Sequence, residues 1–250
     1  ILVNTIFKVD SINKGARILA NMIKDSGKTV ILTGAGMDTE SNIPDFRGRD
    51  GWWKNIDPRQ VASIHTFDRN YPLFHEFYSM RIKNLEGVEP HEGHYILADL
   101  EKKGLIDSIA TQNVSGLHGR AGSRNVYELH GNIRTIRCNR CNSEGKVEDF
   151  LTGKDCSFCN NKALRPNVVL FGEALPMDAW SRAEEDIKES QLLIIIGTSL
   201  EVYPVSYLPM LTKGKIVFIN NEDVDVSYKF HIQLLGKAGE ILKELGKHIV

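Results

Sequence analysis

Apolar residues along this chain gather in short continuous runs that alternate with segments of helical periodicity. We interpret five runs as strands: Thr29–Thr33, Ile106–Thr111, Val168–Phe171, Leu192–Gly197 and Ile216–Asn220. Several of them are apolar throughout, which is typical of parallel strands that are covered by helices on both faces. The hydrophobic pattern therefore predicts a parallel sheet at the centre of the fold.

Helices are predicted where apolar residues recur at intervals of three and four positions. The segment Ser11–Ser26 has this spacing and stops at Gly27, Trp180–Ser190 separates two predicted strands, and a last helix precedes Gly246. Strands that alternate with helices in this way predict a doubly wound, Rossmann-like α/β domain.

Two segments interrupt the alternation. Residues 46–93 hold a loop and an aromatic-rich helical stretch, and residues 134–166 hold all four cysteines and few apolar residues. We expect both to be insertions in one domain of residues 1–250, whose Rossmann-like lobe comprises residues 1–45, 94–133 and 167–250.

The overall composition narrows the function classes only slightly. The chain has 250 residues and a formal net charge of −1, which gives no general attraction to nucleic acid or to an anionic membrane surface. No apolar run approaches the roughly 18 residues that a membrane-spanning helix needs. The first ten residues lack the basic segment and long apolar stretch of a secretory signal. We therefore expect a cytoplasmic protein that does not associate with membranes.

The loop after the first predicted strand is the first candidate for chemistry. Gly34-Ala35-Gly36 follows Thr33, and such a turn brings backbone N–H groups close to the phosphates of a nucleotide. Thr39 stands where a full dinucleotide fingerprint has its third glycine, so an ordinary turn remains an alternative. The following Pro44-Asp45-Phe46-Arg47 suits either a flap over a polar ligand or a solvated loop anchored by its Phe.

The four cysteines form the pattern C-x2-C-x14-C-x2-C at Cys138, Cys141, Cys156 and Cys159. Four thiolates in this arrangement are typical of a structural Zn²⁺ site. Two disulfides or four free thiols are the alternatives, and the absence of a secretory signal favours zinc. The segment has only a mild excess of basic residues and no interleaved aromatics, so we do not expect direct nucleic-acid binding.

Two further groups of polar residues follow predicted strands. Thr111-Gln112-Asn113 ends one strand, and amide side chains at this edge suit hydrogen bonds to an amide or a ribose. A short strand, Val126–Leu129, ends at His130. Histidine ordinarily titrates near neutral pH, so a residue of this type suits the role of a general base. A packed or solvated histidine is the alternative that spacing alone leaves open.

Taken together, these residues resemble the sirtuins, the NAD-dependent protein lysine deacylases. The resemblance covers nearly the whole chain, and the ordered set of motifs is far more specific than any one of them. The matching segments are Gly34–Gly36, Glu40-Ser41, Ile43–Gly48, Thr111–Asn113, Gly116–His118, Glu128–Gly131, the four cysteines, Val168-Val169, Phe171–Glu173, Gly197–Leu200, Val202–Pro204 and Lys237–Glu240.

The resemblance implies roles for individual residues. His130 is implied as the general base that acts on a ribose hydroxyl after the acyl oxygen has displaced nicotinamide, and Asn113 as its catalytic neighbour. The products are free lysine, nicotinamide and acyl-ADP-ribose. The implied NAD contacts are Gly34, Ala35, Gly36, Glu40, Asp45, Phe46, Arg47, Trp53, Gln112, Asn113, Val114, Ser115, Gly197, Thr198, Ser199, Asn220, Asn221, Glu222 and Ala238.

The resemblance also implies a binding site for an acylated lysine peptide, which would contact Val168, Phe171, Gly172 and Glu173. Tyr78 and Arg81 form a Tyr-x-x-Arg pair that is similar to the subclass removing succinyl and malonyl groups as well as acetyl. At i and i+3 the two side chains share a helix face, and Arg offers a fork to a carboxylate. A solvated helix face is the alternative for this pair.

The chain departs from the family pattern at three positions. Ser115 stands where the family usually has an Asp that accepts from the nicotinamide amide, Asp38 replaces a small hydroxyl residue, and Asn42 replaces Gly. A carboxylate at position 38 would repel phosphates if it pointed toward them. Because Ser115 is shorter and uncharged, we expect altered inhibition by nicotinamide.

Two other functions remain open from the sequence. One is NAD cleavage with transfer of ADP-ribose to protein or water. The other is a module that senses NAD without catalysis, which the intact His130 and Asn113 argue against. The partner is expected to be an acyl-lysine protein or peptide, and a chromatin protein is one candidate.

Overall fold

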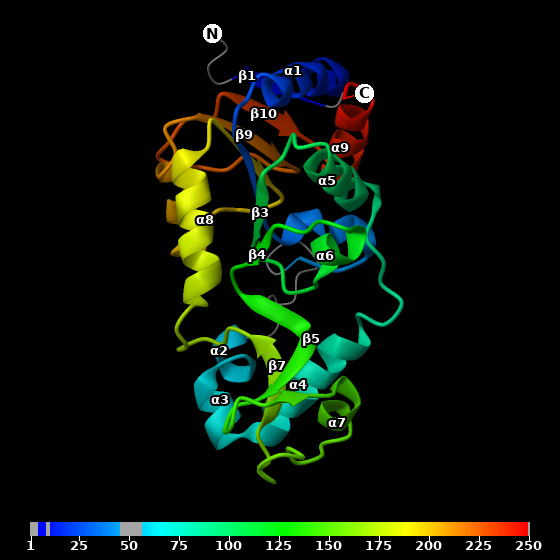
Figure 1. The fold of residues 1–250 in the computed structure, drawn as a ribbon, viewed down its shortest axis with the longest axis vertical. Helices are drawn as coiled ribbons and strands as arrows, with labels where there is room; N and C mark the ends of the chain where they lie inside the picture. The colour runs from blue at the N-terminus through cyan, green and yellow to red at the C-terminus, as the bar shows by residue number, and fades with distance from the viewer. Residues whose placement is uncertain (1–4, 9–10, 46–56, 250) are drawn as a thin grey trace.

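The computed structural model describes residues 5–8, 11–45 and 57–249, which form two lobes stacked along the long axis of the molecule (Figure 1). The larger lobe contains a seven-stranded, all-parallel sheet in the order β1-β10-β9-β8-β2-β3-β4. Its strands are β1 (Thr5–Phe7), β2 (Thr29–Thr33), β3 (Ser108–Thr111), β4 (Val126–Glu128), β8 (Leu192–Ile196), β9 (Lys215–Asn220) and β10 (Ile232–Leu235).

The central strands are apolar throughout because both of their faces are covered. Every residue of β2 and β8 is buried. Along β2, Ile31 faces one apolar cluster while Val30 and Leu32 face the other. This is the strand alternation expected for a sheet between two helical layers.

Helices cover the two faces of this sheet separately. On one face lie α1 (Ile12–Lys24), α5 (Glu92–Lys102) and α9 (Ala238–Gly246), which contribute residues such as Leu19, Leu97 and Ile241 to one apolar cluster. On the other face lie α8 (Met177–Glu189) and the 3-10 segment η5 (Val205–Met210), which contribute Trp180 and Leu208 to the second cluster. Figure 1 shows α8 on the opposite side of the sheet from α5 and α9. Among the described residues, no helix has the length and apolar character needed to cross a membrane.

The smaller lobe combines both sequence insertions. Its helices are α2 (Pro58–Val61), α3 (Ile64–Arg69), α4 (Tyr71–Lys83) and α7 (Val147–Leu151). Its antiparallel sheet has the order β6-β5-β7, with β5 (Gly131–Cys138), β6 (Glu144–Gly145) and β7 (Leu164–Val168). Aromatic residues of α4, such as Phe74, share one apolar cluster with Phe150 of α7 and Leu164 of β7. The two insertions therefore form one packed unit.

The predicted fold class is confirmed: a parallel Rossmann-like sheet carries helices on both faces and a cysteine-containing module. One predicted strand was wrong. Val168–Phe171 is not part of the parallel sheet, because the strand there is β7 (Leu164–Val168), which pairs antiparallel with β5. Short strands β1 and β10 were not predicted, and the proposed domain boundaries remain a prediction.

Candidate active site

The loops that follow β2 and β8 meet at the carboxyl edge of the sheet. The backbone N–H of Gly36 donates to the carbonyl of Gly197 (2.8 Å), and that of Gly34 donates to Ile196 (3.0 Å). Gly197 has φ +64°, and a Cβ there would lie 2.3 Å from the backbone nitrogen of Met37. Only glycine allows these loops to approach so closely, which explains why both loops carry it.

The loop after β3 joins the same edge through its two amide side chains. Gln112 donates through Nε2 to the hydroxyl of Thr198 (3.0 Å), and Asn113 donates through Nδ2 to the carbonyl of Gly34 (2.9 Å). Asn113 is 6% exposed. The three predicted cofactor loops are thus held together by direct hydrogen bonds, at the edge where α/β proteins bind nucleotides.

His130 follows β4 and lies next to this junction. Its Nδ1 is 3.2 Å from the carbonyl oxygen of Gln112. Because a carbonyl only accepts, Nδ1 carries the proton in this contact, which leaves the lone pair on Nε2. Burial lowers the pKa of His130 from its ordinary value of 6.5, and the contact with Gln112 opposes that change. The geometry therefore provides a neutral imidazole with one basic nitrogen.

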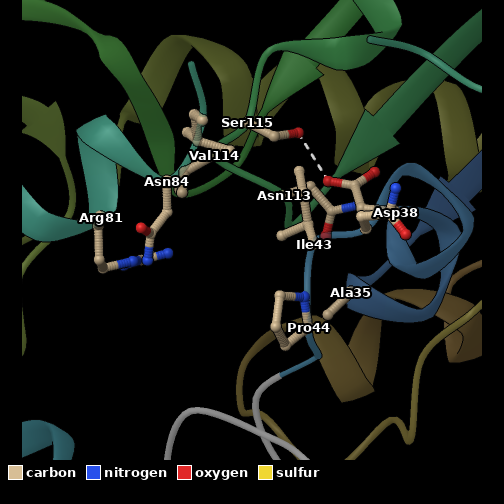
Figure 2. Close-up of a pocket in the computed structure, with 11 residues that line it drawn as sticks. Ala35, Asp38, Ile43, Pro44, Arg81, Asn84, Asn113, Val114 and Ser115 are labelled. Atoms are coloured by element: carbon tan, nitrogen blue, oxygen red, sulfur yellow. Dashed lines mark hydrogen bonds between the residues drawn. The ribbon is translucent and has the colours of Figure 1, made fainter. Parts of the chain in front are cut away.

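Asp38 and Ser115, two departures from the family pattern, are in direct contact. Ser115 donates through Oγ to Oδ2 of Asp38 at 2.6 Å, as the dashed line in Figure 2 shows. His94 of α5 places Nε2 3.1 Å from Oδ1 of the same carboxylate. Asp38 is 3% exposed, so its charge is held among donors rather than directed to solvent.

Two buried histidines, His94 and His118, and the half-buried His91 lie near this carboxylate. The rings of His91, His94 and His118 lie 4.3 and 5.0 Å apart in succession. His118 bonds the hydroxyl of Thr33 through Nε2 (3.0 Å), and burial together with the charge of His94 lowers its pKa to about 3. Burial also lowers the pKa of His91. His118 and His91 are therefore mainly neutral near pH 7 and add little positive charge beside the carboxylate.

A pocket of about 320 Å³ lies between the two lobes, beside this carboxylate. In Figure 2 Asp38, Ser115, Ala35 and Pro44 line one side, and Arg81 and Asn84 of the smaller lobe lie across from them. The remaining lining residues are Asn42, Ile43, Leu85, Asn113 and Val114. A mostly apolar pocket with a few polar groups is the ordinary form of a small-ligand site.

Tyr78 and Arg81 lie together on α4, as their spacing predicts. The guanidinium carbon of Arg81 is 5.9 Å from the centre of the Tyr78 ring. Burial raises the pKa of Tyr78 to about 12, although the charge of Arg81 opposes this rise. Tyr78 is 2% exposed, so of the two residues it is Arg81 that lines the pocket. The solvated helix face, considered from sequence alone, does not describe this pair.

The four cysteines gather at the far end of the smaller lobe. Their sulfur atoms all lie within 4.8 Å of one another, with 3.6 Å between Cys138 and Cys159 and 3.8 Å between Cys141 and Cys156. A tetrahedral zinc site with Zn–S bonds of about 2.3 Å has S–S separations of about 3.8 Å. The residues therefore fit a structural zinc ion, and two disulfides, which need about 2 Å, do not describe this arrangement.

The predicted peptide segment Phe171-Gly172-Glu173 is fixed to its surroundings. Glu173 accepts from Nη1 and Nη2 of Arg165 at 2.6 and 2.8 Å, and from the backbone N–H of Leu170 at 2.8 Å. Arg165 is fully buried. Phe171 exchanges backbone hydrogen bonds with Ala62 and Ile64, and its side chain is 48% exposed.

The remaining predicted residues are placed as follows. Glu40 accepts from the backbone N–H of Gly239 (2.5 Å) at the start of α9, next to Ala238. Asn220 ends β9, Asn221 and Glu222 follow it at the same sheet edge, and Ser199 follows β8. Val168 ends β7, and Asp45 lies just beyond the 3-10 segments η2 (Ala35–Met37) and η3 (Thr39–Ser41). Phe46, Arg47 and Trp53 lie outside the described residues.

Sequence reasoning missed the histidine cluster and the pair formed by Arg165 and Glu173. His118 was noted only as part of a motif, and nothing in its spacing relates it to His91 or His94.

Asn42 has φ +61°, and Asn is the residue that best tolerates this left-handed conformation after glycine. The departure from Gly at this position is therefore compatible with the same turn.

Comparisons with known proteins agree with this geometry. A model of the Sir2 family matches residues 34–204. NAD-dependent protein deacylase 2 of Archaeoglobus fulgidus is 41% identical over 249 residues, with 96% of each chain covered. NAD-dependent protein deacetylase 1 of Geobacillus kaustophilus is 41% identical over 236 residues, with 92% of this chain and 97% of the relative covered.

Solved structures match over a similar length. A Sir2 homolog–NAD complex superimposes with a TM-score of 0.85 at 38% identity, with 93% of each chain covered. A complex of Sir2 with a p53 peptide and NAD+ superimposes with a TM-score of 0.83 at 36% identity, with 92% of this chain and 96% of that chain covered.

Proposed function

The chain belongs to the Sir2 family, and we propose that it is an NAD-dependent protein lysine deacylase acting on acylated lysine side chains of proteins or peptides. The observation that carries the proposal is the placement of His130, whose Nδ1 contacts the carbonyl of Gln112 at the junction of the loops predicted to bind NAD. NAD supplies the electrophilic ribose carbon and the leaving nicotinamide. The fit to NAD is supported by the three loops that meet at one sheet edge.

Each residue at the junction has a separate task in this proposal. His130 holds its proton on Nδ1 through Gln112 and accepts a proton from a ribose hydroxyl through Nε2. Asn113 is fixed by Gly34, which orients the loop against the ribose. The zinc ion at Cys138, Cys141, Cys156 and Cys159 has four protein ligands and so keeps no open position for substrate; its role is structural.

We further propose that Arg81 widens the acyl specificity to succinyl and malonyl groups. Its guanidinium lies across the pocket from the carboxyl edge of the sheet, and the buried ring of Tyr78 lies beside it on the same helix. A carboxylate at the end of an acyl chain would accept hydrogen bonds from Arg81 in a partly desolvated setting, where they are strongest. Tyr78 does not line the pocket itself; burial raises its pKa to about 12, so it stays a neutral neighbour beside the Arg81 guanidinium at physiological pH.

Release of nicotinamide from NAD tests both the proposed deacylase activity and the proposed acyl specificity. The protein is assayed without peptide, with an acetyl-lysine peptide and with a succinyl-lysine peptide of the same sequence. We expect release only with acylated peptide, and we expect His130→Ala to lower the rate of product formation at least about 100-fold, in the range of general-base catalysis. His65→Ala is the matched control, because His65 is exposed on α3.

The acyl preference is tested with Arg81→Met. A hydrogen bond to a charged group contributes about 1.5–3 kcal/mol, so the ratio of succinyl to acetyl turnover should fall at least about 10-fold. Lys83→Met removes a neighbouring cation from an exposed position of the same helix and should leave the ratio unchanged. Release without any peptide would instead indicate ADP-ribose transfer or NAD hydrolysis, and an unchanged ratio in Arg81→Met would remove the acyl proposal.

A further inference from the structure

The departures from the family pattern at positions 38 and 115 are complementary. In the family pattern that the sequence resembles, a hydroxyl residue stands at the position of Asp38 and an Asp stands at the position of Ser115. In the structure these two side chains bond each other at 2.6 Å. This chain therefore has one carboxylate and one hydroxyl here, as the family pattern does. The two groups come from the opposite loops: the carboxylate from the loop after β2 and the hydroxyl from the loop after β3.

The carboxylate of Asp38 is held in a defined orientation. Ser115 donates to Oδ2, and Nε2 of His94 lies 3.1 Å from Oδ1. Arg134 donates through Nε to the backbone carbonyl of Ser115 at 2.6 Å, and its guanidinium interacts electrostatically with Asp38. These contacts give both oxygens of the buried carboxylate a partner within the protein.

The pocket beside Asp38 has the chemistry of a site for a flat ring that carries an amide. Ala35, Ile43, Pro44 and Val114 provide apolar surface, and Asp38 adds a buried carboxylate to the pocket. A carboxylate oxygen has two lone pairs, so each oxygen of Asp38 keeps one after its recorded contact. A primary carboxamide offers two N–H donors that match such an acceptor.

We propose that Asp38 and Ser115 form one exchanged unit in which Asp38 is the positioning residue that accepts from the nicotinamide carboxamide of NAD. This inference rests on the use of NAD proposed above. Ser115 holds the carboxylate through its hydroxyl and does not itself anchor the ring. The prediction of weakened nicotinamide anchoring at Ser115 is thereby replaced: the anchor is retained, but it comes from the loop after β2.

Binding measurements separate this role from catalysis. Isothermal titration calorimetry gives the affinities for two ligands. Carba-NAD carries nicotinamide on an uncleavable linkage, and ADP-ribose lacks nicotinamide. Loss of a charged acceptor should weaken carba-NAD binding about 10- to 100-fold in Asp38→Ser, while ADP-ribose affinity changes less than about 3-fold. Asp38→Asn, which keeps the volume, gives the same comparison if Asp38→Ser folds poorly.

The exchange itself is tested by a double variant. Ser115→Asp alone places two carboxylates in contact, which lowers the melting temperature and weakens carba-NAD binding. Asp38→Ser combined with Ser115→Asp restores the family arrangement and should recover both quantities to within about 3-fold in affinity and a few degrees in melting temperature. Additive effects of the two single changes would overturn the proposal that they form one unit.

The outcomes distinguish this inference from the proposed function. If the wild-type protein releases no nicotinamide with any peptide but loses carba-NAD affinity in Asp38→Ser, the deacylase proposal fails and the assignment of Asp38 stands. If the wild-type protein is an active deacylase and Asp38→Ser and Asp38→Asn both leave the ratio of carba-NAD to ADP-ribose affinity within about 2-fold of wild type, the assignment of Asp38 is overturned.

Discussion

Glu173→Gln should strongly destabilise the protein, because Glu173 neutralises a fully buried guanidinium. Arg165 is 0% exposed and reaches both carboxylate oxygens, at 2.6 and 2.8 Å. Removal of one partner of a buried ion pair costs about 3–5 kcal/mol. Gln retains one acceptor, and Arg165 also contacts the carbonyl of Val168 and the side chain of Asn139. We therefore expect the lower end of this range, about 3 kcal/mol.

The assay is urea and thermal unfolding of the zinc-loaded protein. For a chain of this length, 1 kcal/mol corresponds to about 2–4 °C in melting temperature, so Glu173→Gln should lower it by about 6–12 °C. Asp178→Asn is the matched control. Asp178 pairs with Arg182 at 3.3 Å, but its side chain is 82% exposed, and loss of such a surface pair should change stability by less than about 1 kcal/mol.

The dependence on pH gives a second check. Burial by itself would raise the pKa of Glu173, but the hydrogen bonds from Arg165 and Leu170 outweigh it, and the pKa is lowered overall. A lowered pKa stabilises the folded state above the unfolded value of about 4.3. The difference in melting temperature between wild type and Glu173→Gln should therefore be largest near pH 7 and should shrink as the pH falls below about 4.3. A melting temperature within 2 °C of wild type, or a gap that widens in acid, would refute the reasoning.

Three further measurements follow from the site. Chelation of zinc, or Cys156→Ser, should lower the melting temperature sharply, and mass spectrometry of the native protein should find one zinc per chain; a metal-free protein of equal stability would contradict this. Because burial lowers the pKa of His130, the midpoint of the acid limb in the pH profile of kcat/KM should lie below pH 6.5. A midpoint above pH 7 would argue against His130 as the base. Gly197→Ala should cost more than about 2 kcal/mol and abolish NAD binding, since its Cβ would lie 2.3 Å from the nitrogen of Met37; unaltered binding would show that the two loops separate easily.

The sequence predicted the parallel sheet because its central strands are continuous apolar runs. Thr29–Thr33 was predicted with the bounds that the structure gives, and β8 differs by one residue. The short edge strand β1 (Thr5–Phe7) escaped prediction because three residues carry too little periodicity to distinguish a strand from a loop. The error at Val168–Phe171 has the same origin, since a brief apolar run does not reveal the sheet to which it pairs.

The candidate site was predictable wherever residue types are close in sequence. The spacing of the cysteines predicted that Cys138 and the other three would cluster. The position of His130 after a short strand made it a candidate site residue. Contacts between distant segments were not predictable in this way. Asp38 and Ser115 each looked like a loss when considered separately, and only the distance of 2.6 Å between them relates the two. Arg165 gave no signal at all, because charged residues are ordinarily exposed and its burial depends on Glu173.

The apolar cluster shared by the two insertions also constrains how the chain is made. The helix α4 ends at Lys83, but its packing partners on β7 are complete only about 85 residues later, at Val168. At ribosomal rates of about 5–20 residues per second, the aromatic side chains of α4 wait roughly 4–17 s for their partners. During this interval Phe74 and Tyr78 contact only apolar residues of the same helical insertion, such as Phe67, and lack those of the cysteine module. The apolar cluster of the smaller lobe is therefore incomplete until the cysteine module has been synthesised.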